Sequence, residues 1–342
     1  MQERNEPPFP RLLLAPMATL SHEAFRRAVA RFGGCDEYVT EMIHAPSLLA
    51  GGQWESYYLM SGPEPDKIVW QLTGNTAEPL ARAAALLAER EGIGIDLNMG
   101  CCAPQIARTG AGIAWMLRPA AETAAMVRGV KAALANAAKD GAREKRLSVK
   151  LRLGAEDFTD EGFLAFCDML VSEGVQLLTL HPRTQKEKYR QPPRWDYAER
   201  LALRHAAVPV VLNGNVRDCG SFGRARRAAP HASGVMIARA AAQKPWIFAE
   251  LRGMKADIDL ERVALDFIAD VEQCQPPEFH RTRLQRFFSY FCDNVTFAHW
   301  LKTQLLNAAT PDQCRERVRA YFAQSAEDRF LRLPERRATA LS

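Results

Sequence analysis

Two adjacent thiols stand where a buried strand is predicted to end. Cys101 and Cys102 follow Gly100, directly after the apolar run Gly94–Asn98. Glycine lets the backbone approach a ligand closely. A thiol with an ordinary pKa near ~8.5 stays mostly protonated at neutral pH, as the protonation of a carbanion-like carbon requires. The residue types alone leave open which of the two cysteines acts.

Other ligand-binding side chains occupy the ends of further predicted strands. They supply amide, ammonium, imidazole and guanidinium groups, a combination that turn geometry alone does not require. In chain order they are Pro16 and Met17, Thr40 and Glu41, Gln71, Asp96 and Asn98, Lys150 and Arg152, His181, Asn213-Gly214-Asn215, and Ala238-Arg239. We expect these residues to line one ligand site.

The chemistry of this set suits a flavin mononucleotide. The backbone at Asn213–Asn215 and the guanidinium of Arg239 are suited to a phosphate. Gln71 can bond the carbonyl and NH edge of a heterocycle, and Lys150 can stand beside a ring that gains negative charge on reduction. A sugar phosphate would use many of the same groups, so the residue types leave that alternative open.

The elements that must position these residues alternate between strand and helix. Eight short apolar runs, rich in Val, Ile and Leu, have the character of strands buried on both faces. They are Arg11–Pro16, Glu37–Met42, Lys67–Thr73, Gly94–Asn98, Leu147–Leu153, Val175–His181, Val208–Asn213 and Gly234–Arg239. Helical patterns separate most of them, at Ser21–Phe32, Thr76–Glu91, Pro119–Ala138, Thr159–Glu173, Asp196–His205, Asp218–Ala228 and Ala241–Arg252.

This alternation predicts an α/β fold, a (β/α)8 TIM barrel. A doubly wound open sheet is the alternative. It is disfavoured because no GxGxxG follows the first strand, and because polar residues end almost every strand. In a barrel, the carboxyl ends of the strands form the active site, which is where the candidate residues lie.

The pattern changes after Arg252. Residues 253–342 are predicted to form a small C-terminal helical domain without strands, and residues 1–252 the barrel. The helices of the C-terminal domain are expected at Asp259–Gln273, Phe279–Asn294, Thr296–Asn307 and Pro311–Gln324. From Pro276 onward there are eleven Lys and Arg against seven Asp and Glu, including Arg332, Arg336 and Arg337 in the tail. The excess of four fits either a solvated helical surface or an RNA-binding one.

Composition indicates a globular protein and argues against membrane-spanning and disulfide-rich classes. With 47% hydrophobic and 25% charged residues, the chain of 342 residues is globular in character. We expect it to be cytoplasmic, because no run approaches the ~18 apolar residues of a membrane span and the N-terminus lacks a signal peptide. The sequence does not reveal the oligomeric state, and a monomer is the default expectation. The net charge of +5 permits a nucleic-acid partner without requiring one. Eight cysteines without a CxxC pair predict neither a disulfide scaffold nor a metal site.

Nine segments between Leu12 and Phe248 form an ordered set of motifs. They are LLLAPM (Leu12–Met17), YVTEM (Tyr38–Met42), VWQLTG (Val69–Gly74), GIDLNMGC (Gly94–Cys101), GAGIAWML (Gly110–Leu117), VKLRLG (Val149–Gly154), LTLHPRT (Leu178–Thr184), PVVLNGNV (Pro209–Val216) and GVMIARAAAQKPWIF (Gly234–Phe248). In content and order these motifs resemble those of the tRNA-dihydrouridine synthases. Arg283–Phe322 is more loosely similar to the helical region of the bacterial subgroup C, which favours the RNA-binding interpretation of the basic helices.

The resemblance implies an activity and assigns residues to it. NADPH reduces a bound FMN, the flavin N5 delivers hydride to C6 of a tRNA uridine, and the catalytic Cys101 protonates C5. Subgroup C favours position 16 of the D-loop, and Tyr189 is a candidate contact for the base. The implied FMN contacts are Pro16, Met17, Ala18, Gln71, Lys150, His181, Asn213, Gly214, Asn215, Ala238 and Arg239.

The chain departs from the family pattern at three places. Cys102 replaces the usual proline after the catalytic cysteine, Pro182 replaces a glycine, and Ala238 replaces the first glycine of Gly-Arg-Gly. Two alternatives stay open, and the departures motivate the second of them. One is a small-molecule flavin oxidoreductase of the dihydroorotate dehydrogenase type, and the other is a tRNA-binding flavoprotein without turnover.

Overall fold

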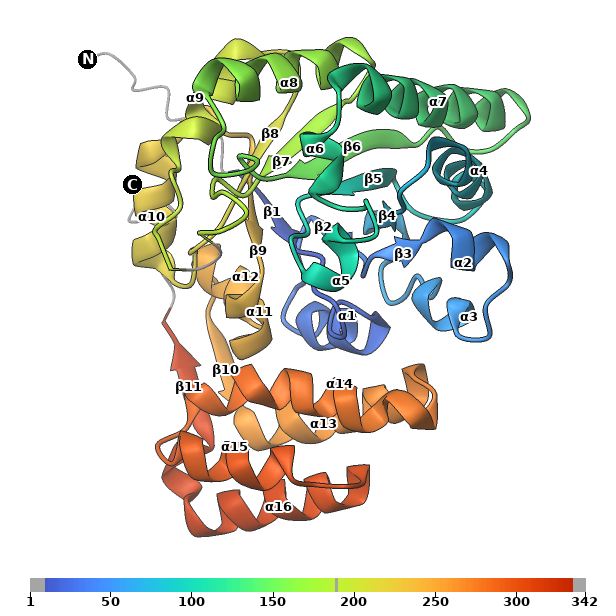
Figure 1. The fold of residues 1–342 in the computed structure, drawn as a ribbon. Helices are drawn as coiled ribbons and strands as arrows, with labels where there is room; N and C mark the ends of the chain where they lie inside the picture. Colours follow the sequence, from blue (N-terminus) through green and yellow to red (C-terminus); the bar gives the residue numbers. More distant parts are fainter. Residues whose placement is uncertain (1–9, 188–189, 335–342) are drawn as a thin grey trace.

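In the computed structural model, which describes residues 10–187 and 190–334, eight parallel strands close into a barrel (Figure 1). Strand β1 pairs with β9 on one side and β2 on the other, and β2 pairs with β4, which completes the ring. The barrel strands are β1 (Arg11–Leu14), β2 (Glu37–Val39), β4 (Ile68–Thr73), β5 (Gly94–Met99), β6 (Arg146–Leu151), β7 (Leu177–Leu180), β8 (Val210–Asn213) and β9 (Gly234–Ile237). The predicted TIM barrel is confirmed.

The second barrel strand contains a bulge. Val39 pairs with Val69 and Ile43 with Leu72, so the three residues Thr40–Met42 stand opposite two residues of β4. Strand β3 (Ile43–His44) resumes the pairing beyond the bulge. The prediction of one continuous strand over Glu37–Met42 was wrong here. Whether a strand contains an extra residue depends on how it pairs with the neighbouring strand, and apolar content does not reveal that pairing.

Helices cover the outside of the barrel (Figure 1). They are α1 (Glu23–Ala30), α2 (Ala45–Leu49), α3 (Glu55–Tyr58), α4 (Ala77–Ala88), α5 (Pro104–Ala107), α6 (Ala114–Leu117), α7 (Ala120–Lys139), α8 (Asp160–Ser172), α9 (Asp196–Arg204), α10 (Cys219–Ala228), α11 (Arg239–Gln243) and α12 (Ile247–Leu251). The single helix expected over Ala241–Arg252 was wrong, since Pro245 separates α11 from α12. Short α2, α3, α5 and α6 lie in segments for which no helix was predicted.

Ser21, the first residue of the helical pattern Ser21–Phe32, does not cap the first helix. His22 is the N-cap of α1, whereas the Ser21 hydroxyl donates to the Ala15 carbonyl at 2.9 Å and accepts from the Met17 N–H at 2.6 Å. Ser21 thereby stabilises the loop between β1 and α1. Thr159 and Asp218 do cap their helices, since their side chains accept backbone N–H bonds at the starts of α8 and α10.

The barrel interior is layered along the strand direction. Because side chains alternate between faces, one residue in two points inward. An apolar inner cluster fills the middle, formed by Leu13, Ala15, Val39, Val69, Leu177, Val211 and Met236. At the amino ends of the strands, buried Glu37 pairs with Arg11 and Arg146. Polar side chains follow the apolar layer toward the carboxyl ends, which places a polar site on an apolar floor.

The C-terminal helices α13 (Leu260–Cys274), α14 (Pro277–Phe291), α15 (Ala298–Leu306) and α16 (Pro311–Gln324) lie together beneath the barrel (Figure 1). Phe287 stacks on Phe267, with ring centroids 3.8 Å apart, and on Phe291 at 5.0 Å. The prediction of no strands in this region was wrong: β10 (Ala256–Asp259) pairs antiparallel with β11 (Phe330–Leu333). Segments so far apart in the chain carry no local signal of their pairing. The boundary after Arg252 stays a prediction.

All eight cysteines lie in the described residues, and none of them forms a disulfide. Within the part of the chain that the structure describes, none of the helices combines the length and apolar character needed to cross a membrane.

Candidate active site

A chain of side-chain hydrogen bonds links three barrel strands at their carboxyl ends. Gln71 Nε2 donates to Asp96 Oδ2 at 2.7 Å, and Asn98 Nδ2 donates to Gln71 Oε1 at 2.9 Å. Ser148 Oγ donates to Asp96 Oδ1 at 2.7 Å. The strand register explains the contacts, because Gln71 pairs with Asp96 and Asp96 with Ser148. All four side chains are buried, so each bond forms away from competing water.

This network fixes the orientation of the Gln71 amide. An amide that could flip would exchange its donor and acceptor. Here the Asp96 carboxylate accepts only and therefore holds Nε2, while Asn98 holds Oε1. Burial raises the pKa of Asp96, and the bonds from Gln71 and Ser148 oppose that rise. Gln71 keeps one N–H and one lone pair in a defined direction for a ligand.

Asn98 also holds the backbone that carries Cys101. Its Oδ1 accepts from the Cys101 N–H at 2.9 Å, with the Gly100 N–H at 3.3 Å. The Cys101 carbonyl accepts from the Ile113 N–H at 3.0 Å. Gly112 sits against that carbonyl with φ +61°, where a Cβ atom would approach its oxygen to 2.6 Å. Both backbone groups of Cys101 are thus bonded.

The Cys101 thiol is in its neutral form at ordinary pH. Burial raises its pKa, although the Ala103 N–H and the cations of Lys150 and Arg152 oppose the rise. A half-buried neutral thiol beside cations is suited to donate a proton rather than to act as a thiolate nucleophile. Cys102 is also half-buried and follows on the same loop.

Cationic side chains surround this thiol on the β6 and β7 side. Burial, with repulsion from Arg152, lowers the pKa of Lys150 to about 8. Arg152 Nε donates to the Gly100 carbonyl at 2.9 Å, which ties β6 to the cysteine loop. The pKa of His181 lies well below its usual range because of burial and of repulsion from Arg152, Lys150, Arg183 and Arg239. His181 is therefore a neutral imidazole.

The tautomer of His181 follows from its neighbour. Arg183 Nη1 lies 2.8 Å from His181 Nε2, and a guanidinium can only donate. Nε2 is then the acceptor and Nδ1 carries the proton. Gly214, at φ +124°, packs against this ring so closely that a Cβ atom would lie 2.9 Å from His181 Cδ2. Only glycine fits there.

The loops after β8, β9 and β1 complete the rim. Asn213 Nδ2 donates to the Met236 carbonyl at 2.8 Å, and Trp195 Nε1 donates to the Gly214 carbonyl at 3.0 Å. Asn215 has a positive φ of +57°. The register of β1 and β9 brings the Pro16–Ala18 loop next to Ala238 and Arg239, because Leu14 pairs with Ile237.

The structure thus brings the predicted site residues to the carboxyl ends of seven described barrel strands: β1, β4, β5, β6, β7, β8 and β9. Sequence reasoning gave no role to Ser148, Arg183, Gly112 or Trp195. The spacing of Asp96 to Asn98 and of Ser148 to Lys150, two residues each, is a signal that they share the inner face. Tyr189 lies outside the described residues.

Several basic residues of the C-terminal region do not form the expected surface. Arg283 is buried, with 3% of its surface exposed. Arg329 pairs with Asp259 and Glu261, and Arg332 pairs with Asp257. Arg336 and Arg337 lie outside the described residues. The excess of basic residues after Pro276 overstated the cationic surface, because acidic residues before Pro276 pair with Arg329 and Arg332.

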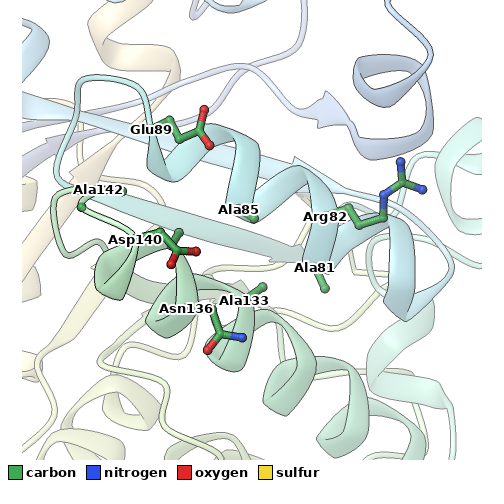
Figure 2. Close-up of a pocket in the computed structure, with 10 residues that line it drawn as sticks. Ala81, Arg82, Ala85, Glu89, Ala133, Asn136, Asp140 and Ala142 are labelled. Carbon is green, nitrogen blue, oxygen red and sulfur yellow. The ribbon is translucent and has the colours of Figure 1, made fainter.

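A groove of about 620 Å³ lies away from this site, between α4 and α7 on the outside of the barrel (Figure 2). Alanines form most of its floor, with Arg82, Glu89, Asn136 and Asp140 at the sides. It carries no cluster of catalytic groups, so the strand ends remain the candidate active site. Over the described residues, no group of three His, Cys, Asp or Glu side chains is arranged to hold a metal ion.

Comparison with known proteins gives a family match over most of the chain. The model of the Dihydrouridine synthase (Dus) family matches residues 13–332. The chain is 33% identical to the tRNA-dihydrouridine(16) synthase of Cupriavidus necator, over 71% of this chain and 74% of that protein. It is 34% identical to the tRNA-dihydrouridine(16) synthase of Ralstonia nicotianae, over 72% and 74%. A probable tRNA-dihydrouridine synthase of Aquifex aeolicus is 29% identical over 90% of this chain and 94% of that protein.

Proposed function

Since the chain belongs to the dihydrouridine synthase family, we propose that it reduces a uridine of tRNA to 5,6-dihydrouridine, with FMN as bound cofactor and NADPH as reductant. The observation that carries the proposal is the neutral Cys101 thiol, held by Asn98 and Ile113 opposite the cations Lys150 and Arg152. Reduction of an activated double bond needs a proton donor in a fixed position and positive charge that stabilises the developing negative charge, and Cys101 with Lys150 and Arg152 can supply both.

The residues present fit an FMN group. The oriented Gln71 amide can bond one heterocyclic edge, and Lys150 supplies positive charge where electron density accumulates. Asn213–Asn215 with Arg239 would hold the phosphate, and Pro16–Ala18 with Ala238 would line the adjacent wall. His181, a neutral imidazole, would bind a ring carbonyl of the flavin. When bound, FMN would supply the hydride for C6 of uracil.

Cys101 would supply the proton at C5. Because burial keeps its pKa high, the thiol carries that proton at neutral pH. Lys150 and Arg152 lower the cost of the thiolate left after proton transfer, since both cations contribute attraction at that sulfur. Asn98 and Ile113 bond the backbone on either side and restrict the direction in which the thiol can point.

The substrate must present an unstacked base. The Gln71 side chain is buried and the Cys101 thiol is half-buried, and a uridine within a helical stack cannot reach them, so the target base would be flipped out. We assign the helices α13–α16 to tRNA binding and the D-loop uridine at position 16 as the target, the position that the names of two relatives carry. Phosphate contacts would make tRNA affinity fall with added salt.

Incubation with FMN, NADPH and unmodified tRNA, followed by nucleoside mass spectrometry, tests the proposal. We expect a nucleoside heavier than uridine by two hydrogen atoms, and digestion into oligonucleotides should place it at position 16. Bound flavin and salt-dependent tRNA affinity without product would instead indicate a tRNA-binding flavoprotein without turnover. Reduction of free pyrimidines with no affinity for tRNA would indicate a small-molecule reductase.

A further inference from the structure

Arg118 bridges two loops at the carboxyl ends of the barrel strands. It is the C-cap residue of α6, and its Nη2 donates to the Gly110 carbonyl at 2.8 Å and to the Asn75 carbonyl at 3.0 Å. Asn75 follows β4, whereas Gly110 belongs to the segment between α5 and α6. Because both acceptors are backbone oxygens, the guanidinium holds the main chains of the two loops together.

The surroundings of Arg118 give its guanidinium a defined position. It lies over the ring of Trp115, 4.1 Å from the centroid. Trp115 is 3% exposed, and its Nε1 donates to the Gly74 carbonyl at 2.8 Å, which holds the ring in place. Gly110 has a φ of +85°, and a Cβ atom there would lie 2.8 Å from Arg118 Nη2. The guanidinium therefore packs between an aromatic face and a residue that must lack a side chain.

The segment that this guanidinium holds is in direct contact with the proposed proton donor. Ile113 lies between the two residues that the guanidinium contacts in this segment, Gly110 and Trp115. The Ile113 N–H donates to the Cys101 carbonyl at 3.0 Å. Gly112 packs on the same oxygen so closely that an added Cβ atom would lie 2.6 Å from it. A displacement of the segment would therefore move the backbone of Cys101 and change the direction of its thiol.

We propose that Arg118 is a positioning residue for proton transfer: it holds residues 110–115 against the loop after β4, and that segment holds Cys101 in the orientation from which its thiol reaches the base. The inference rests on the proposed function, because it takes Cys101 as the proton donor at C5. In this role Arg118 touches neither the cofactor nor the base. Asn75 adds a second tie between the same two loops, since its Nδ2 donates to the Thr109 carbonyl at 2.8 Å.

The test compares Arg118→Met with a matched control at the amino ends of the strands. Arg252 also donates to a backbone carbonyl: its Nη1 bonds the Gly34 oxygen at 2.6 Å, and its Nη2 bonds Asp36 Oδ1 at 2.9 Å. Gly34 and Asp36 precede β2, at the end of the barrel opposite the candidate active site. Arg252→Met therefore removes a comparable arginine without disturbing the segment that contacts Cys101.

Three measurements report on the segment and on the reaction. Steady-state formation of dihydrouridine gives kcat and the KM for tRNA. The rate at which iodoacetamide alkylates Cys101 is followed by mass spectrometry in a Cys102→Ala background, which removes the other half-buried thiol. Hydrogen–deuterium exchange is followed for residues 109–115. Alkylation and exchange are measured on the full chain without tRNA, so they do not depend on the reaction.

We expect Arg118→Met to lower kcat by about tenfold with little change in the KM for tRNA, because the thiol is misdirected while the contacts with substrate remain. Alkylation of Cys101 and exchange of the segment should both become faster, since the segment then opens more often. Arg118→Lys should fall between wild type and Arg118→Met, because an ammonium keeps the charge and a donor but not the planar contact with the ring. Arg252→Met should leave all of these quantities close to wild type.

The outcomes separate the two proposals. Unchanged kcat, alkylation and exchange in Arg118→Met would overturn this inference alone. A raised KM for tRNA with unchanged kcat would also overturn it, since Arg118 would then contact the substrate. Equal effects of Arg252→Met would show only general destabilisation and would likewise overturn it. Failure of the wild type to form dihydrouridine would overturn the proposed function and with it the role in proton transfer. If Arg118→Met does not fold, Arg118→Lys and Asn75→Ala carry the same comparison.

Discussion

Replacing Asp96 perturbs the amide network at its centre. The carboxylate accepts from Gln71 Nε2 and from Ser148 Oγ, each at 2.7 Å, and it is 3% exposed. Asp96→Ala leaves both donors buried without an acceptor and frees the Gln71 amide to flip. Asp96→Asn keeps the shape: its oxygen can accept from Gln71, and its Nδ2 can donate to the Ser148 hydroxyl, which rotates to accept.

The two substitutions should differ in magnitude. A hydrogen bond to a charged group is worth about 1.5–3 kcal/mol, and Asp96 accepts two, but its own burial costs part of that, as its raised pKa indicates. We expect Asp96→Ala to lower the free energy of unfolding by about 3 kcal/mol, and Asp96→Asn by about 1 kcal/mol, because only the charge assistance is lost. FMN affinity should fall about tenfold or more in Asp96→Ala and far less in Asp96→Asn.

Urea unfolding followed by circular dichroism gives the free energies, and flavin fluorescence gives the affinities. Ser148→Ala is the control for the assumed rotation of the hydroxyl. It should cost about 1 kcal/mol less in the Asp96→Asn background than in the wild type, because a neutral amide–hydroxyl bond then replaces the charge-assisted bond to the carboxylate. Equal losses in Asp96→Asn and Asp96→Ala would refute the argument that the oxygen facing Gln71 sets its orientation. So would the absence of any coupling to Ser148.

Three further changes test other parts of the site. Cys101→Ala should lower dihydrouridine formation by roughly 10²–10⁴-fold through loss of the proton donor, whereas Cys102→Ala should leave it close to wild type; the reverse result in the nucleoside assay would move the proton donor to Cys102. Because the pKa of Lys150 is lowered to about 8, its charge is lost as the pH rises through that value. FMN affinity should then fall, and titrations of Lys150→Met should lack that step. Gly112→Ala should lower the free energy of unfolding by about 2 kcal/mol more than Gly141→Ala, since both have a positive φ but only Gly112 has a carbonyl 2.6 Å from the added Cβ; equal losses in urea unfolding would show that backbone strain alone is responsible.

Local patterns were sufficient for much of the site. Gln71, Lys150, His181 and Asn213 were placed together from the sequence because parallel barrel strands bring their carboxyl ends to one rim. The same reasoning could not assign their bonds. Whether Gln71 donates to Asp96 or to another acceptor depends on the register between strands, which apolar content does not encode.

The limits of that reasoning are clearest at the second strand and in the C-terminal region. The Thr40–Met42 bulge and the β10–β11 pairing depend on a partner strand, and no pattern within either segment reveals it. Arg283 belonged by composition to a basic surface, yet its acceptor Glu41 lies 242 residues away in the chain and both are buried.

The sequence by itself determined the barrel, the rim on which the candidate residues lie, the family resemblance and Cys101 as the expected proton donor. The barrel and its rim follow from apolar runs of strand length that alternate with helical patterns, and Cys101 follows from the motifs that resemble the family; all of these are local features. The tertiary structure alone decided which groups hydrogen-bond, which cations are neutralised, and that Arg283 pairs with Glu41. Those outcomes depend on distance and burial between remote segments, and a linear pattern contains neither.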